Sequence, residues 1–159
     1  MRRALLVVAA ALATAPALSS AQVPGLTGSL SLAGGSELGL DSGKAGLFEL
    51  AATAGYELGT MGLRPELGLA VGLAPDGHLA LRPGLSWSVP GFPLRLRVAV
   101  DASNARDSSF GWRWLLVGGA AELRLTGRLA FDGGLDLGLP LAGKAGVPIL
   151  LRVGTSLRF

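Results

Sequence analysis

Hydrophobic and polar residues alternate along most of the chain. Between residues 46 and 59, Phe48, Leu50 and Tyr56 share one parity, whereas Glu49 and Glu57 share the other. Residues at i and i+2 lie on the same face of a β-strand, so this segment is predicted to be a strand with one apolar and one polar face. The pattern recurs, and it predicts eight strands over residues 26–40, 46–59, 63–73, 78–89, 94–102, 113–125, 128–139 and 149–159.

Turn-forming residues separate the predicted strands. Short turns are expected over residues 59–62, 75–77, 90–93 and 126–127, and longer connections over residues 41–45, 103–111 and 140–148. Two strands alternate less regularly than the others. Gly34 and Gly35 interrupt the first strand, where we expect a β-bulge. Trp112 and Trp114 share the polar parity of the sixth strand, so they need a bulge or a loop position to face outward.

The number and length of the strands fit a closed barrel that crosses a membrane. The number is even, and the strands reach the roughly 9 to 11 residues that a tilted membrane-spanning strand needs. Half of the chain is hydrophobic, yet no apolar stretch after residue 21 approaches the roughly 18 residues of a spanning helix. The sequence therefore predicts an all-β protein, an eight-stranded antiparallel up-and-down transmembrane β-barrel.

The polar parity is predicted to line the lumen. A soluble lipocalin-like barrel would instead bury its apolar face around an apolar ligand. Between its charges, however, the polar parity holds mostly glycine, alanine and serine, which fit a narrow interior. Its charges balance, and its basic residues are all arginines, which suit desolvated pairing with carboxylates. The acids are Glu37, Glu49, Glu57, Glu66, Asp101, Glu122, Asp132 and Asp136, and the bases are Arg64, Arg82, Arg95, Arg97, Arg124, Arg128, Arg152 and Arg158.

Strand register predicts two of these ion pairs. A hairpin turning at residues 60–61 places Glu57 opposite Arg64, and one turning over residues 90–93 places Arg82 opposite Asp101. The aromatic residues fall near strand ends, as in the two interfacial girdles of membrane barrels. Those on the side of the short turns are Tyr56, Trp87, Phe92, Phe131 and Phe159, and those on the other side are Phe48, Phe110, Trp112 and Trp114.

The first 21 residues are predicted to be a cleaved secretory signal peptide, which leaves residues 22–159 as the barrel. Arg2 and Arg3 precede an uncharged apolar run over residues 4–13, and Ser20 and Ala21 are small residues at the cleavage site. Without the two arginines, Lys+Arg falls from 14 to 12, against 11 Asp+Glu. No basic cluster remains that would indicate nucleic-acid binding.

The end of the chain resembles the assembly signal of bacterial outer-membrane barrels. Arg152, Gly154, Leu157 and Phe159 match its polar residue, its glycine two positions later, its hydrophobic residue third from the end and its terminal aromatic. With the strand count, this makes the chain similar to the small eight-stranded outer-membrane barrels of the OmpX and OmpA type. The resemblance implies insertion by the barrel-assembly machinery of a Gram-negative bacterium, periplasmic termini and a lumen too narrow for a free aqueous channel. The short outer loops argue against an adhesin.

The second hypothesis is that the protein is an enzyme, but the sequence contains few residues that could form a catalytic site. The single histidine, His78, has no nearby serine that would serve as a nucleophile: Ser86 lies eight residues, roughly 27 Å, along the same strand. Gly43 and Lys44 lack the remaining residues of a phosphate-binding loop. With no cysteine and one histidine, no metal cluster is expected. We therefore expect no enzyme activity and no cofactor.

A short repeat places two lysines in outer loops. Residues 43–46 and 143–146 both read Gly-Lys-Ala-Gly, so Lys44 and Lys144 fall in the first and last outer loops, which are neighbours in a closed barrel. These lysines are candidates for contact with lipopolysaccharide phosphates; coincidence in a Gly- and Ala-rich chain is the alternative. The expected role is that of a monomeric structural or interaction barrel in the outer membrane. A narrow or gated pore and a soluble binder of an apolar ligand remain as alternatives.

Overall fold

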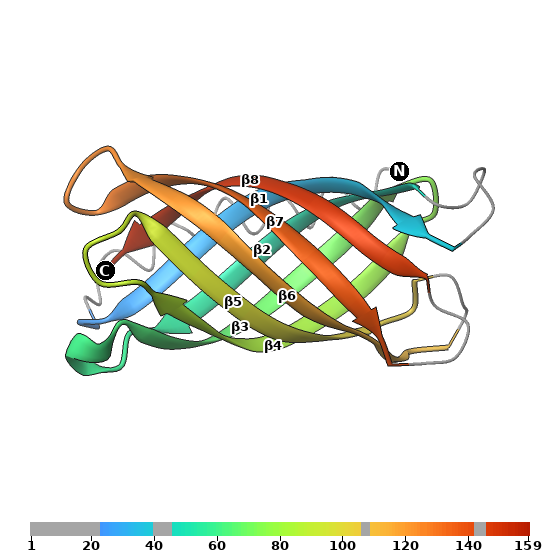
Figure 1. Ribbon diagram of the computed structural model, residues 1–159, viewed down its shortest axis with the longest axis horizontal. Helices are drawn as coiled ribbons and strands as arrows, with labels where there is room; N and C mark the ends of the chain where they lie inside the picture. Colours follow the sequence, from blue (N-terminus) through green and yellow to red (C-terminus); the bar gives the residue numbers. More distant parts are fainter. Residues whose placement is uncertain (1–22, 40–45, 106–108, 142–145) are drawn as a thin grey trace.

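The computed structural model describes residues 23–39, 46–105, 109–141 and 146–159, and their eight strands form a closed antiparallel barrel (Figure 1). The strands are β1 (Leu26–Leu38), β2 (Gly46–Tyr56), β3 (Leu63–Ala74), β4 (His78–Ser88), β5 (Leu94–Ser103), β6 (Gly111–Arg124), β7 (Leu129–Pro140) and β8 (Val147–Arg158). A 3-10 helix, η2 (Gly59–Met61), lies between β2 and β3. No helix among the described residues has the length and hydropathy to cross a membrane.

Each strand pairs with its neighbour in sequence, and β8 closes the barrel against β1. The pairing of β1 with β8 runs without interruption from Thr27 opposite Arg158 to Leu38 opposite Val147. The predicted up-and-down barrel is therefore confirmed. The strands differ from the predicted ranges only at their ends, by one to three residues.

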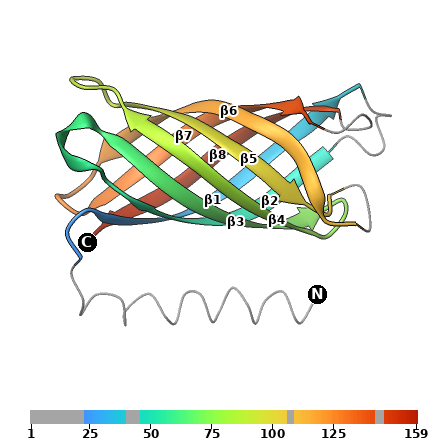
Figure 2. The same ribbon diagram turned by 90° about the horizontal axis from the view of Figure 1, so that it is seen from below.

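The two ends of the barrel differ in their connections. Residues 57–62, 89–93 and 125–128 connect strands at one end, where β1 also begins and β8 ends (Figures 1 and 2). We call this the turn end. β1 ends and β8 begins at the opposite end, where residues 75–77 connect β3 to β4; we call this the loop end. In both views the strands cross the barrel obliquely, as closure of an eight-stranded sheet requires.

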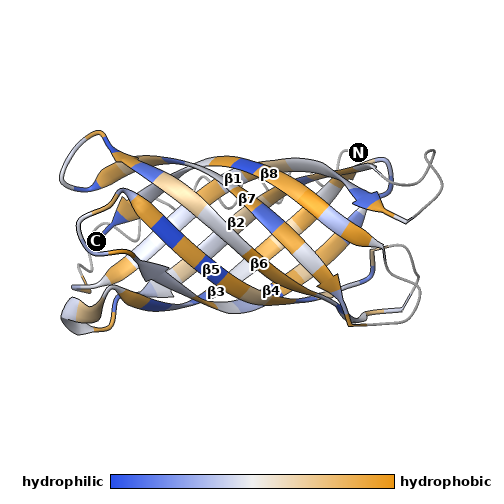
Figure 3. Ribbon diagram, in the orientation of Figure 1, coloured by the Kyte–Doolittle hydropathy of each residue, from blue (hydrophilic) through white to orange (hydrophobic). Residues whose placement is uncertain are grey.

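The apolar parity faces outward. Large hydrophobic side chains are exposed on every strand; Leu69, Leu79 and Leu151, for example, are 60%, 59% and 67% exposed. Apolar and polar segments alternate along the strands in the hydropathy colouring (Figure 3). A water-soluble barrel would bury these residues around its core. The alternative of a soluble lipocalin-like binder is therefore contradicted by the direction in which the leucines point.

The predicted β-bulge at Gly34 and Gly35 is wrong. β1 keeps one register with β2 and one with β8 across both glycines. A Cβ atom at Gly35 would lie only 1.8 Å from the carbonyl oxygen of Ile149, so the glycine serves a close approach between β1 and β8. The register shifts that do occur lie beside Phe48 in the β2–β3 pair and beside Asp101 in the β5–β6 pair.

The bulge between β5 and β6 separates the two tryptophans of β6. Asp101 pairs with Trp114 and Ala102 with Trp112, so Arg113 is the extra residue of the bulge in the backbone register. This extra residue turns the two rings to opposite faces of the sheet. Trp112 is 57% exposed on the outside, whereas Trp114 is 1% exposed inside the barrel. The predicted interfacial position is therefore wrong for Trp114.

Candidate functional site

The interior of the barrel carries most of the predicted lumen charges. Ten of the predicted residues are buried: Glu37, Glu49, Arg64, Glu66, Arg82, Arg95, Arg97, Asp101, Asp132 and Asp136. Charged groups taken out of water must find partners in the protein, because an unpaired buried charge is strongly destabilising. The contacts among these side chains form three groups along the barrel axis.

The group nearest the loop end is centred on Arg82. Its Nη1 and Nη2 atoms donate to the two carboxylate oxygens of Glu49, at 2.7 and 2.8 Å, and its Nε atom donates to Asp101 at 2.7 Å. The predicted pairing of Arg82 with Asp101 is thus present. Nε2 of His78 lies 2.8 Å from Glu49, and Nδ1 lies 3.3 Å from the carbonyl oxygen of Asp76. All three nitrogen atoms of the guanidinium therefore donate to carboxylates.

The Arg82–Asp101 ion pair lies beside an interruption in the sheet. β4 and β5 pair at Leu81 with Ala102 and again at Gly84 with Ala99, with no paired residues between. Pro83 lies in this gap and has no N–H to donate to a neighbouring strand. The ion pair therefore joins β4 to β5 where the backbone ladder does not.

A second group lies in the middle of the barrel. Arg97 contacts Glu66 and, at 3.4 Å, Asp136, and Arg152 lies 3.3 Å from the same Asp136 oxygen. Arg64 lies 3.4 Å from Glu66 and donates to the hydroxyl groups of Ser86 and Thr27. These charges leave a central cavity of about 30 Å³, lined in part by Asp132. A space of this size holds about one water molecule.

The third group lies at the turn end, where the lumen opens. Glu122 accepts from Arg95 and lies 3.1 Å from Arg158 and 3.4 Å from Arg124. Arg158 also lies 3.4 Å from Glu57. The side chain of Arg124 is 65% exposed, against 10% or less for Arg95 and Glu122. These ion pairs therefore range from nearly buried to mostly solvated.

Two features of the turn end differ from the prediction. The register that pairs Gly55 with Glu66 and Leu58 with Leu63 does bring Glu57 opposite Arg64. Their side chains nevertheless contact other partners: Glu57 lies 3.4 Å from Arg158 of β8, and Arg64 lies 3.4 Å from Glu66, two residues along its own strand. Arg128 lies in the exposed turn before β7 rather than in the lumen.

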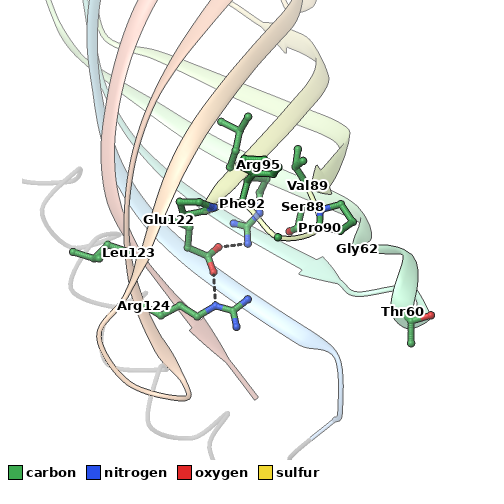
Figure 4. Close-up of a pocket in the computed structure, with 13 residues that line it drawn as sticks. Thr60, Gly62, Ser88, Val89, Pro90, Phe92, Arg95, Glu122, Leu123 and Arg124 are labelled. Carbon is green, nitrogen blue, oxygen red and sulfur yellow. Dashed lines mark hydrogen bonds and ion pairs between the residues drawn. The ribbon is translucent and has the colours of Figure 1, made fainter.

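A pocket opens beside this third group. It has a volume of about 580 Å³ and is lined by η2 residues, by the turn between β4 and β5, and by the end of β6. Glu122 and Arg124 lie on one side and Ser88 and Thr60 on the other, with Arg95 and Phe92 drawn between them (Figure 4). We call this pocket the turn-end mouth. Its lining is both charged and apolar.

An apolar plug fills the lumen toward the loop end. Trp114, Leu116 and Leu150 are 1%, 1% and 2% exposed, and the indole N–H of Trp114 donates to the carbonyl oxygen of Gly146 at 2.9 Å. Pro148 is also fully buried. The sequence carries the signal for this plug, since Trp114 and Leu116 share the parity of Glu122. The prediction that placed all three tryptophans at the membrane interface missed this plug.

Interior glycines make room for the large side chains of the lumen. A Cβ atom at Gly72 would lie 2.0 Å from the His78 ring, and one at Gly138 would lie 2.3 Å from the ring of Pro148. Similarly, a Cβ atom at Gly55 would approach the Arg64 side chain to 2.9 Å. Small residues beside large ones allow a narrow eight-stranded lumen to be filled with side chains.

The remaining predictions concern chemistry and assembly. His78 is buried, and its ring nitrogens contact Glu49 and a backbone carbonyl rather than a nucleophile of the described residues. Among the described residues, no group of acidic and histidine side chains has the arrangement of a metal site. In the predicted assembly signal, Arg152 faces the lumen, whereas Leu157 is exposed on the outside. Lys44, Lys144 and the predicted signal peptide lie outside the described residues.

Comparison with known proteins shows likeness in structure alone. No protein-family model matches the sequence, and no curated protein matches it. The crystal structure of Neisserial surface protein A is similar with a TM-score of 0.56 and 15% identity, over 84% of this chain and 96% of that one. The N-terminal β-barrel domain of Pseudomonas aeruginosa OprF gives a TM-score of 0.51 and 16% identity, over 82% and 97% of the two chains. A de novo designed transmembrane β-barrel gives 0.50 and 17%, over 86% and 97%. The protein thus has the fold of an eight-stranded transmembrane β-barrel.

Proposed function

We propose that this protein is an integral outer-membrane β-barrel with a structural or interaction role, and that its lumen does not conduct solutes. The role proposed is non-catalytic and needs no cofactor. Lipid surrounds the barrel, lipopolysaccharide contacts the loop end, and the protein acts as a monomer. The two termini lie on the periplasmic side.

The observation that carries the proposal is the filled interior. Arg82, Glu49 and Asp101 occupy the lumen near the loop end, with Trp114 and Leu150 packed at 1% and 2% exposure. The space left in the middle is about 30 Å³. A hydrated ion or a sugar needs a far wider path than a space that holds about one water molecule.

The outward face supports the membrane location. A contiguous band of exposed leucine, valine and aromatic residues is far larger than the apolar patches of soluble monomers. In a closed barrel every strand has two neighbours, so backbone polar groups are satisfied without water, as a bilayer requires. The secretory signal expected over residues 1–21 and the closing residues from Arg152 to Phe159 support export and insertion by the barrel-assembly machinery.

Two measurements test this proposal. The protein expressed in a Gram-negative host should be recovered with the outer membrane, and on a gel its unheated form should migrate differently from its boiled form. Recovery in the soluble fraction would contradict the membrane location. In planar bilayers the purified barrel should give no stable single-channel steps; regular steps would instead establish the alternative of a narrow pore.

A further inference from the structure

The turn-end mouth is lined by two arginines, Arg95 and Arg124, and one carboxylate, Glu122. Arg158 also contacts Glu122, and it contacts Glu57 as well. Arg128 lies exposed in the adjacent turn, and Asp132 of β7 pairs with Glu122 of β6. The side chains of this end thus comprise four arginines and three carboxylates, an excess of one positive charge, and the excess lies in the lining of the mouth.

Many hydrogen-bond donors of these arginines remain available. Each guanidinium carries five N–H groups. Arg124 uses its Nε atom on Glu122, and Arg95 uses one Nη atom on the same carboxylate. The other nitrogen atoms of Arg124 have no protein partner among the described residues, and its side chain is 65% exposed. The donors come from β5, β6 and β8, so they approach the mouth from several directions.

The pocket beside these donors is large enough for a ligand. Its volume is about 580 Å³, and the hydroxyl residues Thr60 and Ser88 line the wall opposite Arg124. Phe92, which is 70% exposed, adds an apolar side chain to the lining, beside Arg95 in the view of Figure 4. Leu94 and Leu123, from the outward parity, reach its rim. The pocket thus joins a cationic interior to the apolar surface of the barrel.

We propose that the turn-end mouth binds a phosphoryl group, carried either by a soluble phosphate or by a phospholipid headgroup. A phosphoryl group is an anion attracted by the surplus positive charge, and its several oxygens can accept from guanidinium groups on different strands. Glu122 contacts Arg95, Arg124 and Arg158 and leaves their other N–H groups available. Arg124 supplies the main contact because its outer N–H groups face the pocket.

Titration in solution tests the site. The folded barrel in octyl glucoside, which contains no phosphate, is titrated with inorganic phosphate at constant ionic strength and followed by NMR of backbone and arginine Nε–H signals. In a second arm the micelles are doped with a short-chain phosphatidylglycerol. We expect saturable shifts at Phe92, Glu122 and Arg124, and the arm in which they occur identifies the source of the phosphoryl group. Arg124→Gln should weaken binding about 10-fold, as loss of a charge-assisted hydrogen bond implies.

Arg113→Gln is the matched control, since Arg113 lies at the loop end and donates to the carbonyl oxygens of Ser103 and Ser109. It should leave the titration unchanged. Each variant is first checked for heat-modifiable migration; if Arg124→Gln does not fold, Arg124→Lys replaces it and should show weaker binding than the parent. The proposal is overturned if neither arm gives saturable shifts, if chloride produces the same shifts, or if folded Arg124 variants bind like the parent.

Discussion

The arginines at the two ends of the lumen are paired with carboxylates in different ways. Near the loop end, the three guanidinium nitrogens of Arg82 donate to Glu49 and Asp101 at 2.7 to 2.8 Å, and Trp114 closes over this region. At the turn end, Arg95, Arg158 and Arg124 share Glu122, the last two at 3.1 and 3.4 Å, and Arg124 is much more exposed. Burial and short ion pairs go together at the loop end, whereas the ion pairs of the turn end are partly solvated.

This difference predicts where the barrel is rigid and where it can change. An ion pair out of contact with water is costly to break, because each separated charge would be left in a medium of low polarity. A solvated pair contributes little and exchanges partners readily. We therefore expect the loop end to be the stable part of the lumen and the turn end to be the part that accommodates ligands.

The largest effect is expected for Arg82→Met. The substitution leaves Glu49 and Asp101 buried without their shared cation, so the free energy of unfolding should fall by about 3–5 kcal/mol. Urea unfolding in lipid vesicles, followed by tryptophan fluorescence, measures this change. Arg95→Met at the turn end is the comparison, since Glu122 retains Arg158 and Arg124. Equal losses for the two variants would refute the contrast between the ends.

Trp114→Ala should remove the plug of the loop end. The loss of a large, fully buried ring leaves a cavity, and the free energy of unfolding should decrease by about 3 kcal/mol or more. Trp112→Ala, two residues away on the outer face, serves as the control and should cost much less. The same unfolding measurement applies, and planar bilayers show whether the enlarged space admits ions. Closely similar losses would mean that the bulge in β6 does not separate the two rings as described.

Pro83→Val should strengthen the interrupted pairing of β4 with β5. Valine restores the N–H that proline lacks, and one further ladder hydrogen bond should raise the free energy of unfolding by about 1 kcal/mol. Combined with Arg82→Met, it should reduce the cost of losing the ion pair, since both act at the same place between the strands. A double-mutant cycle measures this coupling. Strictly additive effects would show that the two interactions are independent.

Arg124→Met should have the smallest effect on stability. Its contact with Glu122 is long and mostly solvated, so the free energy of unfolding should change by less than about 0.5 kcal/mol. Repeating the measurement in high salt should make the small difference smaller still, because exposed charges are screened. A loss comparable with that of Arg82→Met would show that this arginine is a structural residue.

Much of the fold could be predicted because alternation has a period of two. A strand with Leu67, Leu69 and Val71 on one parity has a defined outer face, and a slip by one residue would reverse every side chain. Eight such segments with turn residues between them therefore predict the barrel, its register at Arg82 and Asp101, and the direction of the leucines.

The remainder depends on details that alternation does not encode. An extra residue at Arg113 reverses the parity of one tryptophan, and nothing in the local sequence distinguishes Trp112 from Trp114. Ion-pair partners depend on the reach of long side chains across a closed lumen. For this reason Glu57 contacts Arg158 of β8 rather than Arg64 on the adjacent strand. The turn-end mouth combines residues from separate turns and could not be assembled from spacing alone.

The glycines of the lumen also bear on how this sequence can evolve. Gly72 lies against the ring of His78, and Gly138 lies against Pro148. A larger residue at either glycine therefore requires a smaller residue in place of its neighbour on the adjacent strand. Substitutions within each of these pairs should therefore occur together among descendants of this gene. The total side-chain volume inside the lumen would then stay constant, even where the individual residues of each pair change.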